Sequence, residues 1–458
     1  MPAGVQPVPT LRGAPVLGAA PALRRDVLGT LERAHREHGA VVRLVAGPPG
    51  WRHVLHGVFS PEGVEQVLVD GAGRTSKRSS GYEELRAVLG DGVLTSEGER
   101  WRRQRRAVAP ALTRRRTTGP YAAAAVEEAQ RVAAEWEGPA ASGRPVDVHR
   151  AMVGFTARFV GRVLLGADVA DAVPRLMAVA PDFNREVLRR GQQPHPVPRS
   201  WPTPANRRLA AAVAEQRDVV DGLLAQRLAR GADGDGGGGE DLLGLLLQGR
   251  ARGGEDLDDR ELADQVLVFL LAGHETTATA LALALVELAR SPRWQGALQD
   301  EVDAVLGDRP PGGADLPRLV LAERVVREVL RLYPSAPAVP RLAPEGLRVC
   351  GHDLPPGATV VVSPWVVHRD PALWPHPLRF DPSRFEAALP GGHRCAWFPF
   401  GAGPRACVGM QLALAEAVLA LATLLRRYRL STHLDAVPLV AGIALRPDGP
   451  LPVRVHRR

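Results

Sequence analysis

The sequence predicts a mainly α-helical protein with small β-sheets, an α+β fold class. Long segments with helical spacing, rich in alanine, leucine, valine and arginine, fill most of residues 101–305. One apolar segment is unusually long for a helix, and short strand-like runs lie toward the two ends of the chain. Since no internal repeat divides the 458 residues, we expect a single domain over residues 1–458, with small sheets at the margin of a helix-rich body.

In the first half of the chain, the spacing of apolar residues predicts the helices and strands, and stretches rich in proline or glycine predict the connections between them. Residues 26–39 have amphipathic helical spacing, and residues 40–45 favour a strand. The proline-rich residues 189–208 predict a non-helical connection. Around residues 230–241, five glycines in six residues indicate a flexible surface loop between two helices, with an interdomain linker as the alternative.

Near the C-terminus the pattern alternates between strands and a helix. Residues 347–362 predict two short strands around a Pro-Gly turn, and residues 442–455 predict another hairpin. Between them, residues 410–428 have the composition and spacing of a strong helix.

Charge and cysteine content limit the class of protein. The net charge is +8, but the basic residues are spread along the chain and Lys77 is the only lysine. No basic and aromatic nucleic-acid motif is visible, so we expect no nucleic-acid partner, while a positive face for an acidic protein stays open. Three cysteines indicate a reducing compartment and are too few for an all-cysteine zinc or iron–sulfur site.

The first 26 residues lack a long apolar run and are broken by prolines. This pattern is not that of a secretory signal or a membrane anchor. We therefore expect a soluble, cytoplasmic protein.

The longest predicted helix spans residues 258–290. Asp258 and Glu261 have capping-box spacing at its start, and Ser291-Pro292 ends it. At 1.5 Å per residue, the helix would be about 50 Å long. It is apolar nearly all round in its middle, which predicts a core helix. A membrane span is the alternative, but the polar "GHETT" at its centre argues against one.

That polar segment, residues 273–277, conflicts with helix propensity. A mid-helix glycine costs about 1 kcal/mol relative to alanine, and adjacent threonines compete for backbone carbonyls. Such conflicts often mark functional sites, although a solvated kink is the alternative. A carboxylate beside a hydroxyl, as at Glu275 and Thr276, can pass protons from solvent to a buried centre.

A second unusual segment is "FGAGPRACVG", residues 400–409. Its glycines permit backbone shapes closed to other residues, and a predicted helix begins just after Cys407. The helix amides and dipole would favour a thiolate, and Phe400 can shield the sulfur from water. These features favour a metal ligand or a nucleophile, with a buried inert cysteine as the alternative.

The same segment matches the pattern Phe-x-x-Gly-x-Arg-x-Cys-x-Gly of the cytochrome P450 family at every fixed position. Four further segments resemble family motifs in the expected order, so that the resemblance runs from residue 101 to residue 409. They are "WRRQR" (Trp101 to Arg105), "AGHETT" (Ala272 to Thr277), "EVLR" (Glu328 to Arg331) and "FDPSRF" (Phe380 to Phe385).

The resemblance, to soluble bacterial members, implies a P450 fold with a haem buried between the long helix and the cysteine loop. Cys407 would ligate the iron of haem b as a thiolate, which favours O–O cleavage, with Phe400 beside it. The expected partners of the haem carboxylates are Trp101, Arg105, Arg341 and Arg405. Glu328, Arg331 and Arg384 would form a structural triad. No role is expected for Cys350 and Cys395, and no second metal at His274 or His368.

By the same resemblance, the protein is a monooxygenase that uses O2 and oxidises a lipophilic molecule such as a terpenoid, fatty acid, steroid or polyketide, in secondary metabolism. Glu275 and Thr276 would deliver the protons. The substrate-facing segments would be residues 75–94 and 180–205, the helix at Ala272, and the small apolar segments 335–339 and 439–443.

Electrons would come from NAD(P)H through a separate ferredoxin reductase and an acidic ferredoxin. The chain has no Gly-x-Gly-x-x-Gly nucleotide loop, and we expect it to be a monomer. Arg102, Arg103 and Arg106 are candidates for the ferredoxin-docking face, with an ordinary solvated face as the alternative. A peroxide-driven peroxygenase and a non-enzymatic haem sensor are the competing functions.

Overall fold

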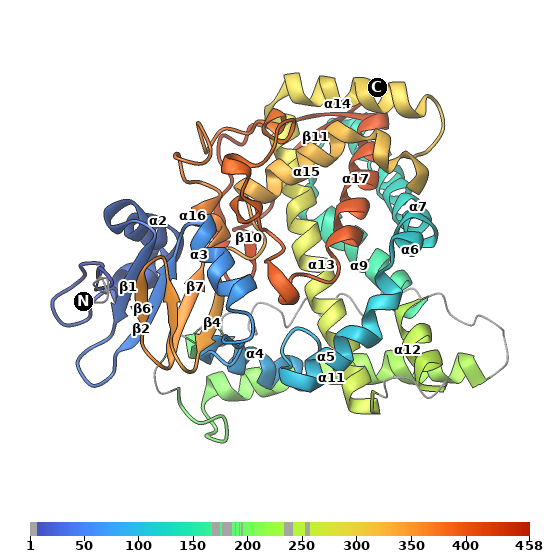
Figure 1. Cartoon of the computed structure of the whole chain (residues 1–458). Helices are drawn as coiled ribbons and strands as arrows, with labels where there is room; N and C mark the ends of the chain where they lie inside the picture. The colour runs from blue at the N-terminus through green and yellow to red at the C-terminus, as the bar shows by residue number, and fades with distance from the viewer. Residues whose placement is uncertain are drawn as a thin grey trace.

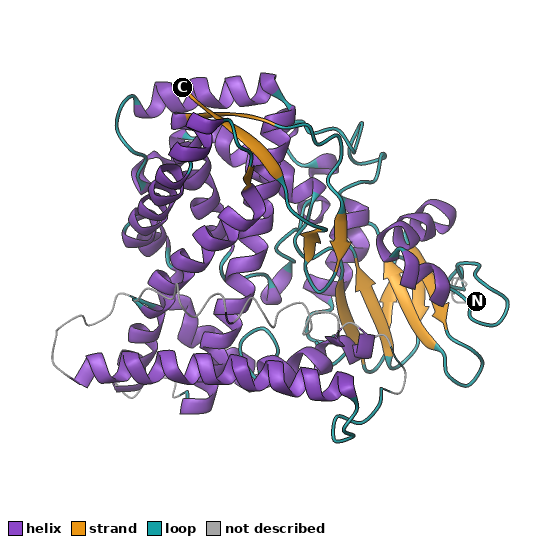
Figure 2. Cartoon of the chain, turned by 180° about the vertical axis from the view of Figure 1, so that it is seen from behind, coloured by secondary structure: helices purple, strands orange, loops and turns teal. Residues whose placement is uncertain are grey.

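The computed structural model describes residues 7–166, 175, 186–187, 189–191, 193, 196–232, 241–251 and 257–458. Helices form the body of the molecule, and the strands gather mostly at one side of it (Figure 1, Figure 2). The expected mainly α-helical class with small sheets is thus confirmed. The glycine-rich loop expected around residues 230–241 falls mainly on residues 233–240, which lie outside the described residues.

The helices follow in chain order. They are α1 (Ala20–Arg25), α2 (Val27–His38), α3 (Pro61–Glu65), the π-turn η1 (Gln66–Asp70), α4 (Ser80–Leu89), α5 (Gly98–Val108), η2 (Ala109–Leu112), α6 (Arg114–Thr118), α7 (Pro120–Glu135), α8 (Glu137–Ser142), α9 (Val148–Leu165), α11 (Pro204–Ala232), α12 (Leu242–Ala251), α13 (Asp259–Arg290), α14 (Pro292–Leu306), η3 (Gly313–Arg318), α15 (Val320–Leu332), α16 (Pro364–Val367), η4 (Pro382–Phe385), η5 (Pro390–Gly392), η6 (Arg394–Ala396), η7 (Gly403–Arg405) and α17 (Met410–Arg427).

Within the described residues, four small sheets accompany them. The strands are β1 (Val41–Ala46), β2 (His53–Val58), β3 (Val146–Asp147), β4 (Val339–Ala343), β5 (Leu347–Val349), β6 (His352–Leu354), β7 (Ala358–Val362), β8 (Tyr428–Ser431), β9 (Leu439–Ala441), β10 (Leu445–Pro447) and β11 (Pro452–Arg457). The largest sheet has the order β1-β2-β7-β4, and only its β2–β7 pair is parallel. The others are β3-β11-β8, β5-β6 and β9-β10.

Helix α13 lies in the middle of the helical body, with α9, α15 and α17 packed against it (Figure 1). Its start is fixed as expected, because the Asp258 side chain accepts from the Glu261 amide at 2.7 Å in a capping box. Its most apolar 18-residue window has a mean hydropathy of 1.6, enough for a membrane span by length and composition. Since 67% of that window is buried inside the protein, α13 is a core helix, as predicted.

Two strand predictions were wrong in their pairing. Residues 347–362 form three strands, and the hairpin turn lies at Cys350 and Gly351, whose φ angles are 47° and 82°. The Pro-Gly segment instead leads out of this hairpin into β7, which pairs with β2 and β4. The reason lies in β7 itself, whose Val360 and Val362 are completely buried and require a central position in the larger sheet.

The hairpin predicted at residues 442–455 is also absent, because β10 pairs with β9 while β11 pairs with β3 and β8. The Pro-Asp-Gly segment therefore joins two sheets.

The non-helical connection expected at residues 189–208 is shorter than predicted. Residues 189–191 are helical and α11 already begins at Pro204, because proline is tolerated in the first helical turn.

A buried ion pair anchors the segment that leads to the cysteine loop. Glu328 and Arg331, both 0% exposed, are joined by two hydrogen bonds of 2.7 and 2.8 Å. Arg384 approaches the same carboxylate at 3.3 Å, so the expected triad is present. Arg331 also donates to the carbonyl of His368, whose ring nitrogen Nε2 accepts the Phe398 amide at 2.9 Å. The triad thus fixes the chain just before the cysteine loop.

At the N-terminal side, His35 on α2 bonds Asp370 at 3.1 Å. This bond raises the pKa of His35 above its ordinary 6.5 and lowers that of Asp370. The stabilisation from His35 is complete below its unfolded pKa and is lost as pH rises through its raised folded pKa. That from Asp370 is lost only in acid, as pH falls through its lowered folded pKa.

We therefore expect the free energy of unfolding to fall by about 0.5–1 kcal/mol from this pair between about pH 6 and pH 8. Urea titrations at the two pH values measure it. The Asp370→Asn variant is the matched control, because the asparagine oxygen can still accept the Ala372 amide. An equal pH dependence in both proteins would contradict the assignment.

Candidate cofactor and active site

The loop from Phe400 to Gly409 is held by its backbone. The Cys407 amide donates to the Phe400 carbonyl at 2.9 Å, and Gly401 and Gly403 have φ angles of 71° and 69°. A Cβ on Gly403 would lie 2.1 Å from the Leu68 carbonyl oxygen of η1. Only glycine fits there, both for its conformation and for this close approach. The loop therefore rests directly on η1.

Cys407 retains accessible surface, although many protein atoms surround its thiol. Burial raises the pKa of the thiol, while the Gly409 amide and the charges of Arg105 and Lys77 act in the opposite direction. Desolvation outweighs these contributions, so the Gly409 amide and the nearby charges favour the thiolate without bringing the pKa of the thiol below its ordinary value. A metal cation bound to the sulfur would stabilise the thiolate form further.

Two residues expected to hold the cofactor meet beside this loop. The Arg405 guanidinium lies 3.9 Å from the centre of the Trp101 ring, donates to the Ser96 carbonyl at 3.0 Å and pairs with Glu97 at 2.8 Å. Arg105, one turn after Trp101 on α5, donates to the carbonyl of Ala406 at 3.0 Å. Helix α5 thus supplies a stacking ring and a cation next to the residue that precedes Cys407.

The third arginine comes from a distant part of the chain. Arg341 on β4 is 5% exposed and donates to the carbonyl of Pro340. Its charge acts on Lys77, as do the charges of Arg405 and Cys407. Lys77 was not among the predicted site residues, yet it is buried here at 7% exposure. The signal that would have identified it is its being the only lysine of the chain.

Burial opposes the positive charge of three cations in this cluster. It lowers the pKa of Lys77, Arg105 and Arg405, and mutual repulsion with Arg341 adds to the effect for Lys77 and Arg405. Glu97 is the acid that offsets part of this charge. Buried cations in excess over anions fit a site for an anionic group.

The polar segment of α13 does not break the helix, which is continuous from Asp259 to Arg290. The Thr276 hydroxyl donates to the Ala272 carbonyl at 2.8 Å, satisfying itself within the helix. Ala272 is exposed although Leu270 and His274 beside it are buried. One face of α13 therefore has accessible surface halfway along a core helix, and Glu275 is half-buried next to Thr276.

Of the segments expected to face substrate, residues 335–339 contact this part of α13 directly, and two others lie next to them or contact α13 further toward its start. The Ser335 hydroxyl donates to the Thr276 carbonyl at 3.1 Å, and the Leu445 amide next to the β9–β10 turn donates to the Ser335 carbonyl at 2.8 Å. From the loop of residues 75–94, the Val93 amide donates to Gln265 of α13 at 3.0 Å. The remaining segment, residues 180–205, lies partly outside the described residues.

The residues expected to have no metal role occupy structural positions. His274 bonds the Leu270 carbonyl through Nδ1 at 2.5 Å, and burial lowers its pKa, which keeps it neutral. His368 is fully buried and its pKa lies well below 6.5, again mainly from burial. Among the described residues, no group of three or more His, Cys, Asp and Glu side chains could hold a metal ion. Cys350 lies against Ser60, and Cys395 is buried.

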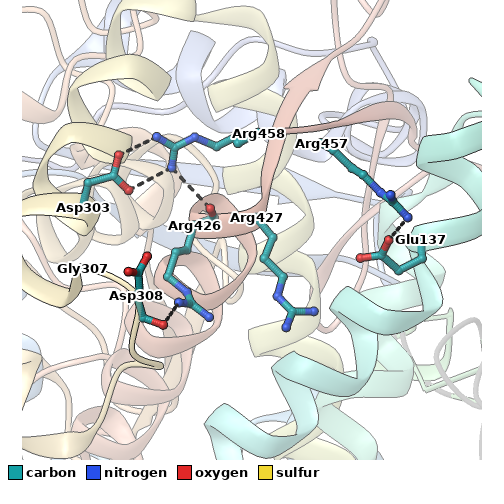
Figure 3. A pocket seen from close by; sticks show the side chains of 8 residues that line it. All are labelled: Glu137, Asp303, Gly307, Asp308, Arg426, Arg427, Arg457 and Arg458. Atoms are coloured by element: carbon teal, nitrogen blue, oxygen red, sulfur yellow. Dashed lines mark hydrogen bonds and ion pairs between the residues drawn. The ribbon is translucent and has the colours of Figure 1, made fainter.

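The described part of the chain also has pockets at its surface. One, of about 310 Å³, reaches Trp101 and Arg405 from outside. Another, of about 440 Å³, lies at the C-terminal end of α17 (Figure 3). Most of its charged lining is already paired within the protein, through Arg458–Asp303, Arg457–Glu137 and the bond from Arg426 to the Asp308 carbonyl. None of its lining residues belongs to the candidate site.

Comparisons with known proteins identify relatives of this chain. The family model for cytochrome P450 matches residues 7–449. The chain is 37% identical to cyclooctatin synthase of Streptomyces melanosporofaciens, over 91% of this chain and 88% of that protein. It is 33% identical to cyclooctat-9-en-7-ol 5-monooxygenase of the same organism, over 96% and 93% of the two chains. It is also 33% identical to pentalenene oxygenase of Streptomyces avermitilis, over 92% and 91%.

Proposed function

Because this chain belongs to the cytochrome P450 family and its monooxygenases, we propose that it hydroxylates a terpenoid in secondary metabolism, using O2 and electrons from a separate redox partner. The observation that carries the proposal is a convergence. Charged side chains from separate segments of the chain act on the Cys407 thiol and on one another, and the core helix α13 has accessible surface at its polar segment. Relatives named for cyclooctat-9-en-7-ol and pentalenene favour a terpenoid over the other lipophilic classes.

The residues present fit a haem. Cys407 offers the sulfur ligand, and the buried cations need anionic partners of the kind that the two haem carboxylates provide. We assign Trp101, Arg105, Arg341 and Arg405 to that role. Phe400 is assigned to shielding the Cys407 sulfur from water. When bound, haem supplies the activation of O2 and the oxidation of a C–H bond.

Glu275 and Thr276 are assigned to proton delivery. The Thr276 hydroxyl donates a hydrogen bond to the Ala272 carbonyl, so its oxygen lone pairs remain able to order a water or accept a proton. Glu275, half-buried beside it, is the group that can take a proton from solvent and pass it on. The small apolar segments 335–339 and 439–443 give a substrate hydrophobic contact without a charged anchor.

Electrons are proposed to come from NAD(P)H through a ferredoxin reductase and an acidic ferredoxin. The enzyme is proposed to be a monomer in the cytoplasm. The candidate docking arginines are partly neutralised, because Arg102 and Arg106 pair with Glu99, and Arg103 pairs with Glu261.

The decisive experiment supplies ¹⁸O2, a ferredoxin system and a panel of terpenoids. One labelled oxygen atom per product supports the proposal. Faster turnover with hydrogen peroxide alone would favour a peroxygenase, and no product with any substrate would favour a sensor.

The Thr276→Ala variant is expected to keep haem but to divert electrons to hydrogen peroxide, because it removes a proton-delivering hydroxyl. The product formed per electron should fall about tenfold or more. Coupled measurement of NAD(P)H consumed, peroxide and product tests this. Thr279→Ala, three residues further along α13 and fully buried, is the matched control and should stay coupled. Unchanged product per electron in Thr276→Ala would refute the proton-delivery role.

A further inference from the structure

Helix α9 brings a histidine to the side of α13 that carries the polar segment. The two helices pack against each other (Figure 1). Thr156 of α9 donates to the carbonyl of His274 at 2.9 Å, and a Cβ on Gly273 would lie 3.2 Å from Val160. His149 lies seven residues before Thr156, so both belong to the same face of α9, the face that contacts α13.

A third segment joins this region. Strand β10 packs against α13, and Arg446 is its central residue. From there the chain runs to Leu451, whose amide donates at 3.1 Å to Asp147, the N-cap of α9. The charges of Asp147, Glu275 and Arg446 all act on His149. Charged groups from the start of α9, from α13 and from β10 thus meet around one imidazole.

The ring of His149 has a buried nitrogen. Its Nε2 is buried and has no hydrogen-bond partner among the described residues, while the residue as a whole is only half-buried. A buried polar atom of this kind is normally satisfied by an ordered water. Burial lowers the pKa of His149 and Arg446 acts in the same direction, whereas Asp147 and Glu275 oppose them. Such an imidazole can take a proton from solvent and release one on its buried side.

The other polar groups of this region are less suited to move protons. Three backbone amides hold the Asp147 carboxylate as the cap of α9. Arg446 keeps its proton at any pH that the protein survives. His274 is 6% exposed, and its Nδ1 bonds the Leu270 carbonyl, so it has little access to solvent.

We propose that His149 resupplies Glu275 with protons, so that α9 takes part in the proton delivery assigned to α13. The imidazolium form releases its Nε2 proton through ordered water to the Glu275 carboxylate, and the neutral imidazole that remains takes a new proton from solvent. No electron moves in this exchange. The inference rests on the proposed function, and His149 is a positioning residue in it, because it acts through Glu275 and not on the reacting atoms.

The first test measures the link between the two side chains without turnover. In the reduced protein with bound carbon monoxide, which is diamagnetic, ¹³C-histidine signals are titrated between about pH 5 and pH 8, and His149→Gln identifies the signal of His149. Glu275→Gln should lower the pKa of His149, because it removes a negative charge that raises it. Arg446→Gln should raise that pKa, because it removes a positive charge that lowers it. The same pKa in wild type and both variants would overturn the inference.

The second test follows product formed per electron against pH. In wild type it should rise as pH falls through the pKa of His149, because the protonated fraction grows. His149→Gln should lose this step and form at least about threefold less product per electron at the acid end. His456→Gln, exposed on β11, is the control and should follow wild type.

The failures of the two proposals are distinct. A wild-type pH profile in His149→Gln would overturn the inference about His149. So would an equal loss at every pH, which is what a purely structural role predicts. Wild-type protein that binds no thiolate-ligated haem would instead overturn the proposed function.

Discussion

Cys407→Ser is expected to lose monooxygenase activity by at least about 1,000-fold. An alcohol oxygen is a far weaker electron donor than a thiolate, and the thiolate is what favours O–O cleavage. The loop itself should persist, because its shape depends on the Phe400 carbonyl, the Cys407 amide and the packing of Gly403 on Leu68. The variant should therefore remain folded while its chemistry disappears.

The spectrum of the reduced protein with carbon monoxide measures this directly. Wild type should show the red-shifted Soret band of a thiolate opposite carbon monoxide, and Cys407→Ser should not. Cys350→Ser and Cys395→Ser are the matched controls, since neither cysteine lies in the loop, and both should keep band and activity. A thiolate-type band that survives in Cys407→Ser would place the ligand elsewhere.

Arg331→Met is expected to have the largest effect on stability, a loss of about 3–5 kcal/mol in the free energy of unfolding. Burial already raises the pKa of Glu328, and Arg331 is the main group that lowers it. Removing the guanidinium leaves a carboxylate of 0% exposure with only Arg384 as a charged partner, and frees the carbonyls of His368 and Pro377. The segment before the cysteine loop should loosen as a result.

Urea unfolding followed by far-ultraviolet circular dichroism gives the free energy. The double variant Glu328→Gln/Arg331→Met is the informative control. Because it removes both charges, it should be less destabilised than the sum of the two single variants. Arg324→Met, on the same helix but paired with Glu386 at the surface, should cost less than about 1 kcal/mol. Additive losses would mean that Glu328 and Arg331 act independently.

Local patterns predicted the elements on which the site is built. The capping box at Asp258 and the stop at Ser291 set the ends of α13, and both are properties of neighbouring residues. The glycine pattern around Cys407 likewise records a local backbone shape. Such features can be recognised in a sequence because their causes lie within a few positions.

The rest depended on distant parts of the chain. Strand β7 pairs with β2, some 300 residues earlier, so its partner cannot be inferred from the Pro-Gly turn beside it. The direction of the Cys407 pKa is decided by a competition between burial and the charges of Arg105 and Lys77. The place of Lys77 in the site could not be predicted for the same reason, since Arg341 and Arg405, whose charges act on it, come from two other regions of the chain.

The contact between Gly403 and Leu68 limits how this enzyme can be recombined. A chimera that takes its N-terminal third from one parent and its C-terminal third from another inherits the two sides of that contact separately. If the π-turn of the first parent is offset by a few tenths of an ångström, the thiol shifts with it. Exchanges that transfer residues 66–70 and 400–409 together keep the π-turn and the Cys407 loop that packs on it matched.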